Sequence, residues 1–333
     1  MALDPVPWFV GGGAEHSPEV ARLLAYAATS GSEGIINVGD LKVAPLAVPG
    51  SSVRVLTGAC AIRSNAAGGS QQTYIGRNVS ETGVSISATG SGSGRSDLIV
   101  AQVEDPFMAG ENWSQPTNAK VGPYIFIRVI PNVPAGTTRL QDVSGYSGRT
   151  AITLARIDIP ANTGTITAGM IKDLRNVANP RRERRVDVFI PASATDFTAH
   201  DSVRRWYPLL NSLVRTPTWA TQAQLVVSIS NILMTGNLTG NVRAEYGYGP
   251  SDGGAFISTT PGGLHKIDQA NTGDWRRGGL TMGGELAIPA SFRGKDHYIR
   301  TGTLLNTEAL TGKLTIDAYT TVVADIEFVE IPE

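Results

Sequence analysis

The sequence predicts a mainly β protein with one helix near the N-terminus. Glycine (38 residues) and proline (19) are abundant in the 333-residue chain, and charged residues make up only 17%. Val, Ile and Thr recur in short runs bounded by turn residues, which is typical of many short strands. The length fits two domains of ordinary size. We therefore expect an N-terminal β-sandwich or open barrel, a short neck, and a C-terminal antiparallel jelly-roll-like β-sandwich.

The first expected element is an arm over residues 1–16. It contains two prolines and the apolar residues Trp8 and Phe9, and three consecutive glycines follow. Glycine leaves the backbone free to turn after the apolar residues. We expect Trp8 and Phe9 to anchor the arm on a neighbouring protein.

A helix over residues 17–30 should follow the arm. Ser17 is a good N-cap, and Pro18 suits the first helical position. Four apolar residues then repeat at i, i+3, i+4 and i+7 and form one face of the helix: Val20, Leu23, Leu24 and Ala27. We expect this face to dock on an apolar surface, with the two leucines as assembly residues.

The helix begins a β domain over residues 17–177. Its expected strands are Leu41–Val48, Ser52–Leu56, Ala59–Arg63, Gln72–Arg77, Val84–Ala88, Asp97–Glu104, Tyr124–Ile130 and Ile152–Ile159. Pro160 ends the last of them, because proline cannot donate to a sheet ladder. Residues 168–174 carry helix formers and should form one short helical turn.

A second β domain is expected over residues 187–333. Its strands should be Val186–Pro191, Trp206–Arg215, Ala223–Leu233, Gly240–Tyr246, Phe256–Thr260, Glu285–Pro289, Asp296–Leu305, Gly312–Thr321 and Val322–Ile331. The glycine-rich stretch between residues 260 and 284 is expected to be a loop.

An arginine-rich neck over residues 178–186 should join the two domains. Four arginines follow Pro180, with Glu183 as the one acidic residue among them: Arg181, Arg182, Arg184 and Arg185. Such a block can bind phosphate, solvate an extended linker, or pair with acidic residues of a neighbouring subunit. We expect the neck to act in assembly.

No motif in the sequence indicates catalysis, a cofactor or a metal. The four histidines show no metal-ligand spacing, and no G-x-S-x-G, Walker or dinucleotide-binding pattern occurs. Cys60, the single cysteine, lies in an alternating strand pattern and should be a buried structural thiol. The carboxylate pairs Glu104/Asp105 and Asp325/Glu327 fit strand ends or solvated faces. The sequence therefore predicts no enzyme.

Charge and hydropathy patterning exclude further classes of function. A net charge of −1 indicates no nucleic-acid binding. No apolar run approaches the roughly 20 residues that span a bilayer, so no membrane insertion is expected. Residues 1–13 lack the basic region of a secretory leader, and we expect a chain that is not secreted.

Aromatic residues in the loops of the second half suggest glycan contact. Flat aromatic faces backed by polar side chains are suited to sugar rings. We expect Trp275, within NTGDWRRGG, to be exposed, and we expect Arg276 and Tyr248 to be further contacts.

Three stretches in the first half resemble a known module. They are WFVGGGAEHSPEVARLLAYAATSGSEGIINVGDLKV (8–43), GRSDLIVAQVEDP (94–106) and LARIDIPANTGTITAGMIKDLR (154–175). Their order is similar to that in the N-terminal module of minor tail proteins from siphophages infecting actinobacteria such as mycobacteria. A looser form occurs in other phage baseplate and tail-fibre proteins. The turn after the last strand reads Pro160-Ala161-Asn162 where glycine is common, and Asn tolerates the left-handed conformation.

The resemblance covers about residues 1–185 and carries its own implications. It implies a virion protein of the tail tip or baseplate, made in the host cytoplasm, whose N-terminal module attaches to other tail proteins. It implies no enzyme, and it makes Asp173 and Arg175 structural residues of the closing signature. We expect a homo-oligomer, a trimer, whose C-terminal domain is displayed for assembly or host-surface contact.

Two other functions remain open on the sequence. The chain could be a carbohydrate-binding module that recognises host envelope glycans. It could also be a hydrolase that degrades the envelope. Loss of ligand binding on Trp275→Ala would indicate the first alternative, and release of product from envelope polysaccharide would indicate the second.

Overall fold

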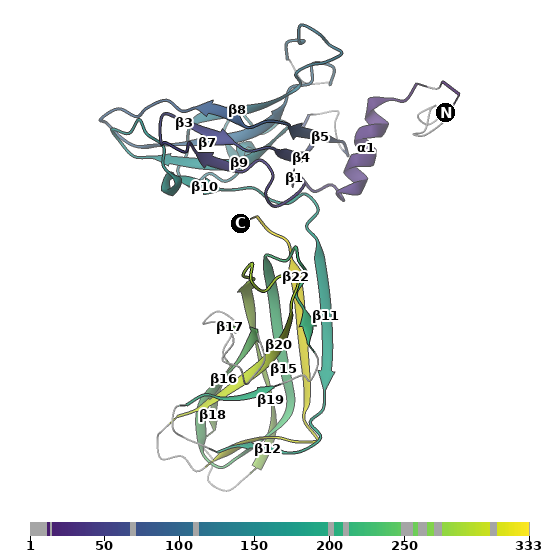
Figure 1. The fold of residues 1–333 in the computed structure, drawn as a ribbon, viewed down its shortest axis with the longest axis vertical. Coiled ribbons are helices and arrows are strands. Elements are labelled where there is room, and N and C mark those ends of the chain that lie inside the picture. Colours follow the sequence, from purple (N-terminus) through teal and green to yellow (C-terminus); the bar gives the residue numbers. More distant parts are fainter. Residues whose placement is uncertain are drawn as a thin grey trace. The chain divides into compact units, whose positions relative to one another are not determined.

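The computed structural model of the chain is mainly β with one α-helix among its described residues, as the sequence predicts (Figure 1). The described residues are 12–13, 15–66, 71–108, 113–198, 203–208, 213–247, 256–258, 265–269, 275–306 and 312–332, with backbone alone for 206–208 and 258. The chain forms two compact units, Met1–Asn179 with Pro332–Glu333, and Pro180–Ile331.

The helix of the first unit, α1, spans Pro18–Ala28. The hydroxyl of Ser17 accepts a hydrogen bond from the backbone N–H of Val20 at 3.3 Å, which caps the first turn. Ser30 and Gly31 have positive φ angles of 51° and 74° and turn the chain away from the helix. The predicted helix over residues 17–30 is confirmed, with its ends one or two residues shorter.

The strands of the first unit form three antiparallel sheets. These are β1 (Gly34–Ile35), β4 (Gly58–Arg63) and β5 (Thr73–Asn78); β2 (Val43–Pro45), β3 (Ser52–Val55) and β6 (Thr82–Ser85); and β10 (Ile171–Asp173), β9 (Ala151–Ile159), β7 (Arg95–Val103) and β8 (Ile125–Val133). One apolar core draws side chains from all three sheets and includes Cys60, which is fully buried.

Strand β7 is buried on both faces. Ile99 and Ala101 join the main core, while Leu98 and Val100 join a smaller core under the 3-10 helix η1 (Leu140–Asp142). A strand buried on both faces has a continuous apolar run in place of an alternating one. This explains the run LIVA in the centre of β7.

The end of the first unit differs from the prediction. Residues 168–170 form the 3-10 helix η2 (Ala168–Met170), but residues 171–173 are strand β10, which pairs antiparallel with residues 155–157 of β9. The helical turn predicted to extend to residue 174 is therefore wrong beyond Met170. Pairing with an existing strand overrides a weak helix propensity.

The second unit consists of two antiparallel sheets that enclose one core. The first sheet has the order β11 (Arg182–Phe189), β22 (Thr321–Val329), β15 (Gln222–Thr235), β21 (Lys313–Ile316), β12 (Thr195–Phe197), with β19 (Trp275–Ala287) on the other edge of β15. The second has the order β13 (Arg205–Pro208), β20 (Asp296–Leu305), β16 (Leu238–Gly247), β17 (Phe256–Ser258), with β14 (Val214–Arg215) on β20 and β18 (His265–Gln269) on β16.

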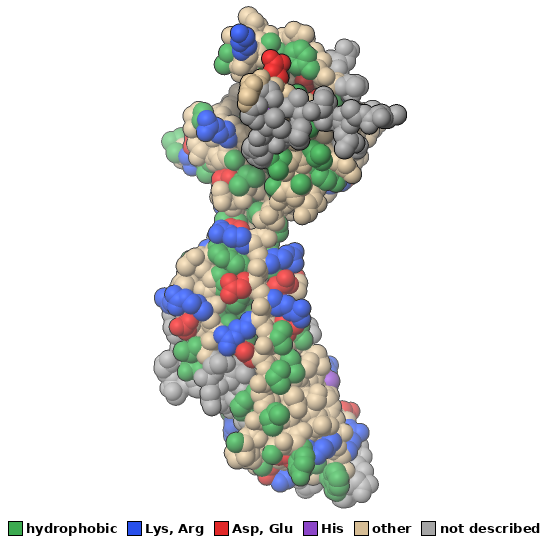
Figure 2. Space-filling view, turned by 90° about the vertical axis from the view of Figure 1, so that its right-hand side faces the viewer, with side chains coloured by type: hydrophobic (Ala, Val, Ile, Leu, Met, Phe, Trp, Pro, Cys, Tyr) green, Lys and Arg blue, Asp and Glu red, His purple; other side chains and the backbone are tan. Residues whose placement is uncertain are grey.

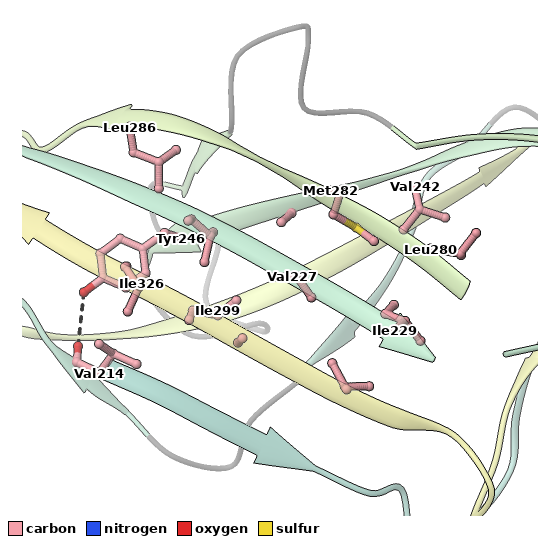
Figure 3. Close-up of a cluster of buried hydrophobic side chains, with 14 of the residues drawn as sticks. Val214, Val227, Ile229, Val242, Tyr246, Leu280, Met282, Leu286, Ile299 and Ile326 are labelled. Atoms are coloured by element: carbon pink, nitrogen blue, oxygen red, sulfur yellow. Dashed lines mark hydrogen bonds between the residues drawn. The ribbon is translucent and has the colours of Figure 1, made fainter. Parts of the chain in front are cut away.

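Side chains from both sheets meet in this core, as Figure 3 shows. Val227 and Ile229 of β15 lie opposite Val242 and Ile299 of the second sheet. Tyr246 is fully buried, and its hydroxyl donates to the carbonyl of Val214 at 3.2 Å. A buried tyrosine needs such a partner, because an unsatisfied hydroxyl is costly in an apolar core.

Two predictions for the second domain are wrong. Residues 182–186, expected in an extended neck, are the first part of strand β11, because they pair with residues 325–329 of β22. The expected loop over residues 260–284 contains strands β18 and β19. Glycine in β19 permits close backbone approach: a Cβ on Gly283 would lie 2.4 Å from the carbonyl oxygen of Leu225.

Candidate functional site

The helix α1 turns its apolar face away from the unit to which it belongs. Leu23 and Leu24 are 45% and 48% exposed, and Ala27 is exposed as well. The other face, which contains Arg22 and Thr29, is the more buried one. The predicted apolar face therefore exists, and the described residues of the chain leave it largely uncovered.

Arg22 attaches the helix to the sheet through polar contacts. Its Nε donates to the Gln72 side-chain oxygen at 2.6 Å, and its Nη2 lies 3.0 Å from Glu19. The guanidinium lies 5.0 Å from the centre of the Tyr74 ring on β5, and the Tyr74 hydroxyl donates to Asp105 at 2.9 Å. Sequence reasoning missed Arg22, since a single arginine on the polar face of a predicted helix carries no signal of its own.

A cleft of about 420 Å³ lies beside the first turn of α1. It is lined by Pro18, Glu19, Arg22, Tyr74, Asp105, Phe107, Ala119 and Tyr124. Phe107 is 63% exposed, and its ring centre lies 6.3 Å from that of Tyr124. The cleft and the leucine face thus place exposed apolar side chains on two sides of α1.

Asp173 and Arg175 form a structural clamp. The buried guanidinium of Arg175 donates to both carboxylate oxygens of Asp173 and to the backbone carbonyls of Val38 and Asp40, the last at 2.6 Å. The arginine thus ties the last strand of the unit to the loop that follows β1. The structure brings these two predicted residues together, while their part in assembly stays a prediction.

The four arginines of the predicted neck lie along the edge of the second unit, and their charges are paired within that unit. Arg184 donates to Asp325 at 2.8 Å, Arg182 lies 3.5 Å from Glu327, and both carboxylates belong to the adjacent strand β22. Figure 2 shows basic and acidic side chains alternating along this edge. We call this row of ion pairs the β11 ladder. Because each arginine has a carboxylate partner, the ladder is a poor candidate for a phosphate site.

Arg181 and Arg185, at the two ends of the ladder, have partners of a different kind from those of Arg182 and Arg184. Arg181 donates to Glu330 from Nε at 2.8 Å, and Glu330 is only 3% exposed. This bond lowers the pKa of Glu330 below its usual range, and Arg184 does the same for Asp325. Arg185 lies 2.7 Å from Asp187 of its own strand and donates to the carbonyl of Leu213.

The predicted glycan contacts have different outcomes. Trp275 is 70% exposed, as expected, at the start of β19. Arg276 donates from Nε to the Gln269 side chain of β18 at 2.7 Å. Tyr248, and also Trp8 and Phe9 of the arm, lie outside the described residues. Two residues after Trp275, the guanidinium of Arg277 lies 5.1 Å from the centre of the Tyr319 ring, a contact that sequence reasoning missed because the two residues are 42 positions apart in the chain.

Two side chains of types that often support chemistry, Cys60 and His297, are buried. Burial raises the pKa of the Cys60 thiol to about 12, which makes it unreactive at neutral pH. His297 is buried between Thr216 and the ring of Phe292. Within the described ranges, no three His, Cys, Asp or Glu side chains gather as a metal site requires.

Known proteins show only distant structural likeness to this chain. No protein-family model matches the chain, and no curated protein sequence matches it significantly. The solved structure of infectious bursal disease virus strain Gx matches at 12% identity and a TM-score of 0.26, over 91% of this chain and 80% of that chain. The VP2 subviral particle of the same virus matches at 12% identity and a TM-score of 0.27, over 91% and 77%.

A third likeness is to carbohydrate-binding modules of the β-sandwich superfamily. It has 10% identity and a TM-score of 0.17, over 88% of this chain and 98% of that chain. At such identities and TM-scores none of these likenesses carries an argument about function. No described helix is long and apolar enough to cross a membrane.

Proposed function

We propose that the chain is a structural component of a phage tail tip or baseplate. In this proposal the first unit attaches to other tail proteins, and the second is displayed for assembly or host-surface contact. The role is not enzymatic, the protein forms a homo-oligomer with three copies, and it resides in the virion. The resemblance of residues 1–185 to minor tail proteins supports this proposal, and the orientation of α1 carries it.

A helix on the surface of a monomeric protein normally turns its apolar stripe toward the core. In α1, Arg22 contacts Gln72 and Tyr74 of the first unit, whereas Leu23 and Leu24 remain about half exposed. Burying a leucine side chain completely contributes about 1.5–3 kcal/mol, so two half-exposed leucines leave a useful part of that free energy for association. We therefore infer that this face of the helix is covered by another protein in the assembled particle.

The test replaces both leucines with aspartate in the full-length chain. Leu23→Asp combined with Leu24→Asp should lower the molar mass measured by analytical ultracentrifugation and should prevent incorporation into tail particles. Both positions are already half-exposed, so the circular dichroism spectrum should not change. The matched control is Val48→Asp combined with Val79→Asp, which adds the same charge at two residues that are 82% and 72% exposed and outside the helix.

Two outcomes would contradict the proposal. If the double variant assembles as the unmodified chain does, α1 is not the attachment surface. If the unmodified chain sediments as a monomer at micromolar concentration and is absent from particles, the structural role itself is wrong.

A further inference from the structure

Two aromatic side chains of the second unit are highly exposed, and each is related to one arginine, the first by its position on the same strand and the second by a direct contact. Trp275 is 70% exposed and Tyr319 is 75% exposed, the largest values among the large hydrophobic side chains described in this unit. Arg277 follows Trp275 by two residues, and its guanidinium lies 5.1 Å from the centre of the Tyr319 ring. We call these three residues the aromatic platform.

The strand geometry places Trp275 and Arg277 on the same side of the sheet. Side chains two positions apart on a strand share a face. Leu280 and Met282, at the other parity of β19, are buried in the core. Trp275 and Arg277 therefore project outward from the sandwich, and Tyr319 covers the guanidinium on that outer side.

Arg277 is held in place from two directions. Its Nη1 and Nη2 donate to the two carboxylate oxygens of Asp317 at 3.0 and 2.7 Å, and Nη1 also donates to the carbonyl of Asn231 at 2.6 Å. Asn231 has a positive φ of 58° in an irregularity of β15. Asp317 in turn accepts the backbone N–H of Tyr319 at 3.0 Å. The platform is consequently preorganised, with its aromatic turn and its arginine fixed to each other.

The remaining hydrogen-bonding capacity of Arg277 indicates what the platform can bind. A guanidinium has five N–H donors. The three bonds to Asp317 and Asn231 use three of them, which leaves Nε–H and one Nη2–H without an acceptor among the described residues. The charge of Arg277 is compensated by Asp317. A ligand at this position therefore meets two donors beside the Tyr319 ring, with Trp275 two positions along the same face of β19 and no net charge from the Arg277–Asp317 pair.

We infer that the aromatic platform binds a neutral glycan. The apolar C–H faces of sugar rings pack on the exposed side chains of Trp275 and Tyr319, and sugar hydroxyls accept hydrogen bonds from the Nε–H and Nη2–H of Arg277. An anionic ligand would require an uncompensated cation, which the bidentate pair with Asp317 does not offer. The site lies entirely in the second unit and does not depend on the attachment surface at α1.

The test measures binding of the full-length chain to a printed array of bacterial surface polysaccharides that includes neutral and acidic members. The neutral glycan that gives the strongest signal is then titrated by isothermal calorimetry. Trp275→Ala and Tyr319→Ala should each weaken its affinity about tenfold or more, while Trp275→Phe and Tyr319→Phe should retain most of it. The thermal midpoint should change little, because both side chains are exposed.

Phe107→Ala is the matched control, since it removes an exposed aromatic side chain from the first unit and should leave glycan affinity unchanged. The inference is overturned if no neutral glycan binds, if acidic glycans alone bind, or if both alanine variants bind as the unmodified chain does. Loss of particle assembly in these variants without any glycan binding would identify the platform as a protein contact and would also overturn it. The Leu23/Leu24 double aspartate variant should still bind the glycan, which separates this test from that of the attachment surface.

Discussion

Arg277 and Asp317 form a two-point ion pair across the outer face of the second unit, with nitrogen–oxygen distances of 3.0 and 2.7 Å. The hydrogen bonds from Arg277 lower the pKa of Asp317 from 3.8 to about 2. Because the folded-state pKa lies below the unfolded one, the pair stabilises the fold above about pH 4 and loses its contribution as the pH falls toward 2.

The first prediction concerns this pair. Arg277→Gln should raise the pKa of Asp317 back toward its ordinary value of 3.8. A titration of the Asp317 carboxyl carbon by NMR measures the midpoint directly. Arg276→Gln is the control, because Arg276 donates to Gln269 instead. An unchanged midpoint in the Arg277 variant would show that another group holds the carboxylate in its charged form.

The second prediction concerns the clamp at the end of the first unit. Arg175→Ala should lower the free energy of unfolding of that unit by about 2–4 kcal/mol, because the carbonyls of Val38 and Asp40 lose a buried donor. Urea unfolding followed by circular dichroism measures the loss. Arg128→Ala, which removes an exposed partner of Glu104, should cost far less. Similar losses of unfolding free energy in both variants would show that the buried contacts of Arg175 contribute no special stability.

The third prediction separates two members of the β11 ladder. Arg181→Ser should destabilise the second unit by about 1–3 kcal/mol, because it leaves the buried Glu330 carboxylate without its ion-pair partner. Arg184→Ser should have little effect, since Arg184 and its ion pair are solvent-exposed. Thermal unfolding at pH 7 compares the two variants. Equal thermal midpoints for the two variants would mean that the buried ion pair of Glu330 contributes no more stability than the exposed pair of Asp325.

The same pair predicts a pH dependence. Arg181 lowers the folded-state pKa of Glu330 below 4.5, so this stabilisation is complete above the unfolded pKa and is lost as the pH falls through the lower, folded value. Unfolding curves recorded below pH 5 should therefore converge for the unmodified chain and Arg181→Ser. A stability difference between the two proteins that stays constant as the pH falls would show that the ionisation of Glu330 is not coupled to folding.

The fourth prediction concerns His297, which is buried against Phe292 at a ring distance of 4.3 Å. Burial lowers its pKa below 6.5, so the unfolded state takes up the proton first as the pH falls. The second unit should lose stability between about pH 6.5 and the lower, folded pKa. His297→Gln should flatten that slope. Thermal midpoints at pH 7.5, 6.5 and 5.5 provide the comparison.

The fifth prediction concerns two glycines close together in the sequence. Gly34 has a φ of 149°, and a Cβ there would lie 2.0 Å from the carbonyl oxygen of Asn176. Gly34→Ala should therefore cost more than about 2 kcal/mol in unfolding free energy. Gly39 has no atom within 4 Å of an added Cβ, so Gly39→Ala should be close to neutral. Urea unfolding of both variants measures the difference.

Local patterns in the sequence predicted the elements whose signals are themselves local. Ser17 and Pro18 correctly indicated the start of α1. The alternation of apolar and other residues around Cys60 indicated that it lies on the buried face of a strand. The run LIVA in β7 also predicted a strand correctly. The helix cap joins residues three positions apart. The two strands were predictable because the apolar pattern of a strand reflects which of its faces are buried.

Relations between distant segments could not be predicted in this way. The apolar stripe of α1 was correctly identified, but its outward direction depends on contacts of Arg22 with Gln72 and Tyr74. The arginines after Pro180 suggested a neck because their partners, Asp325 and Glu327, lie about 140 residues away. The glycines of β19 suggested a loop, whereas they allow close packing against β15.

The burial of Cys60 has a practical consequence. It is the single cysteine of the chain, and its thiol, with a pKa of about 12, will not react with maleimides at neutral pH. A cysteine introduced at Val48 in the first unit and another at Val226 in the second would therefore be labelled without removing the native one. Fluorophores on those two sites would report the separation of the two units in solution, in an otherwise unmodified protein.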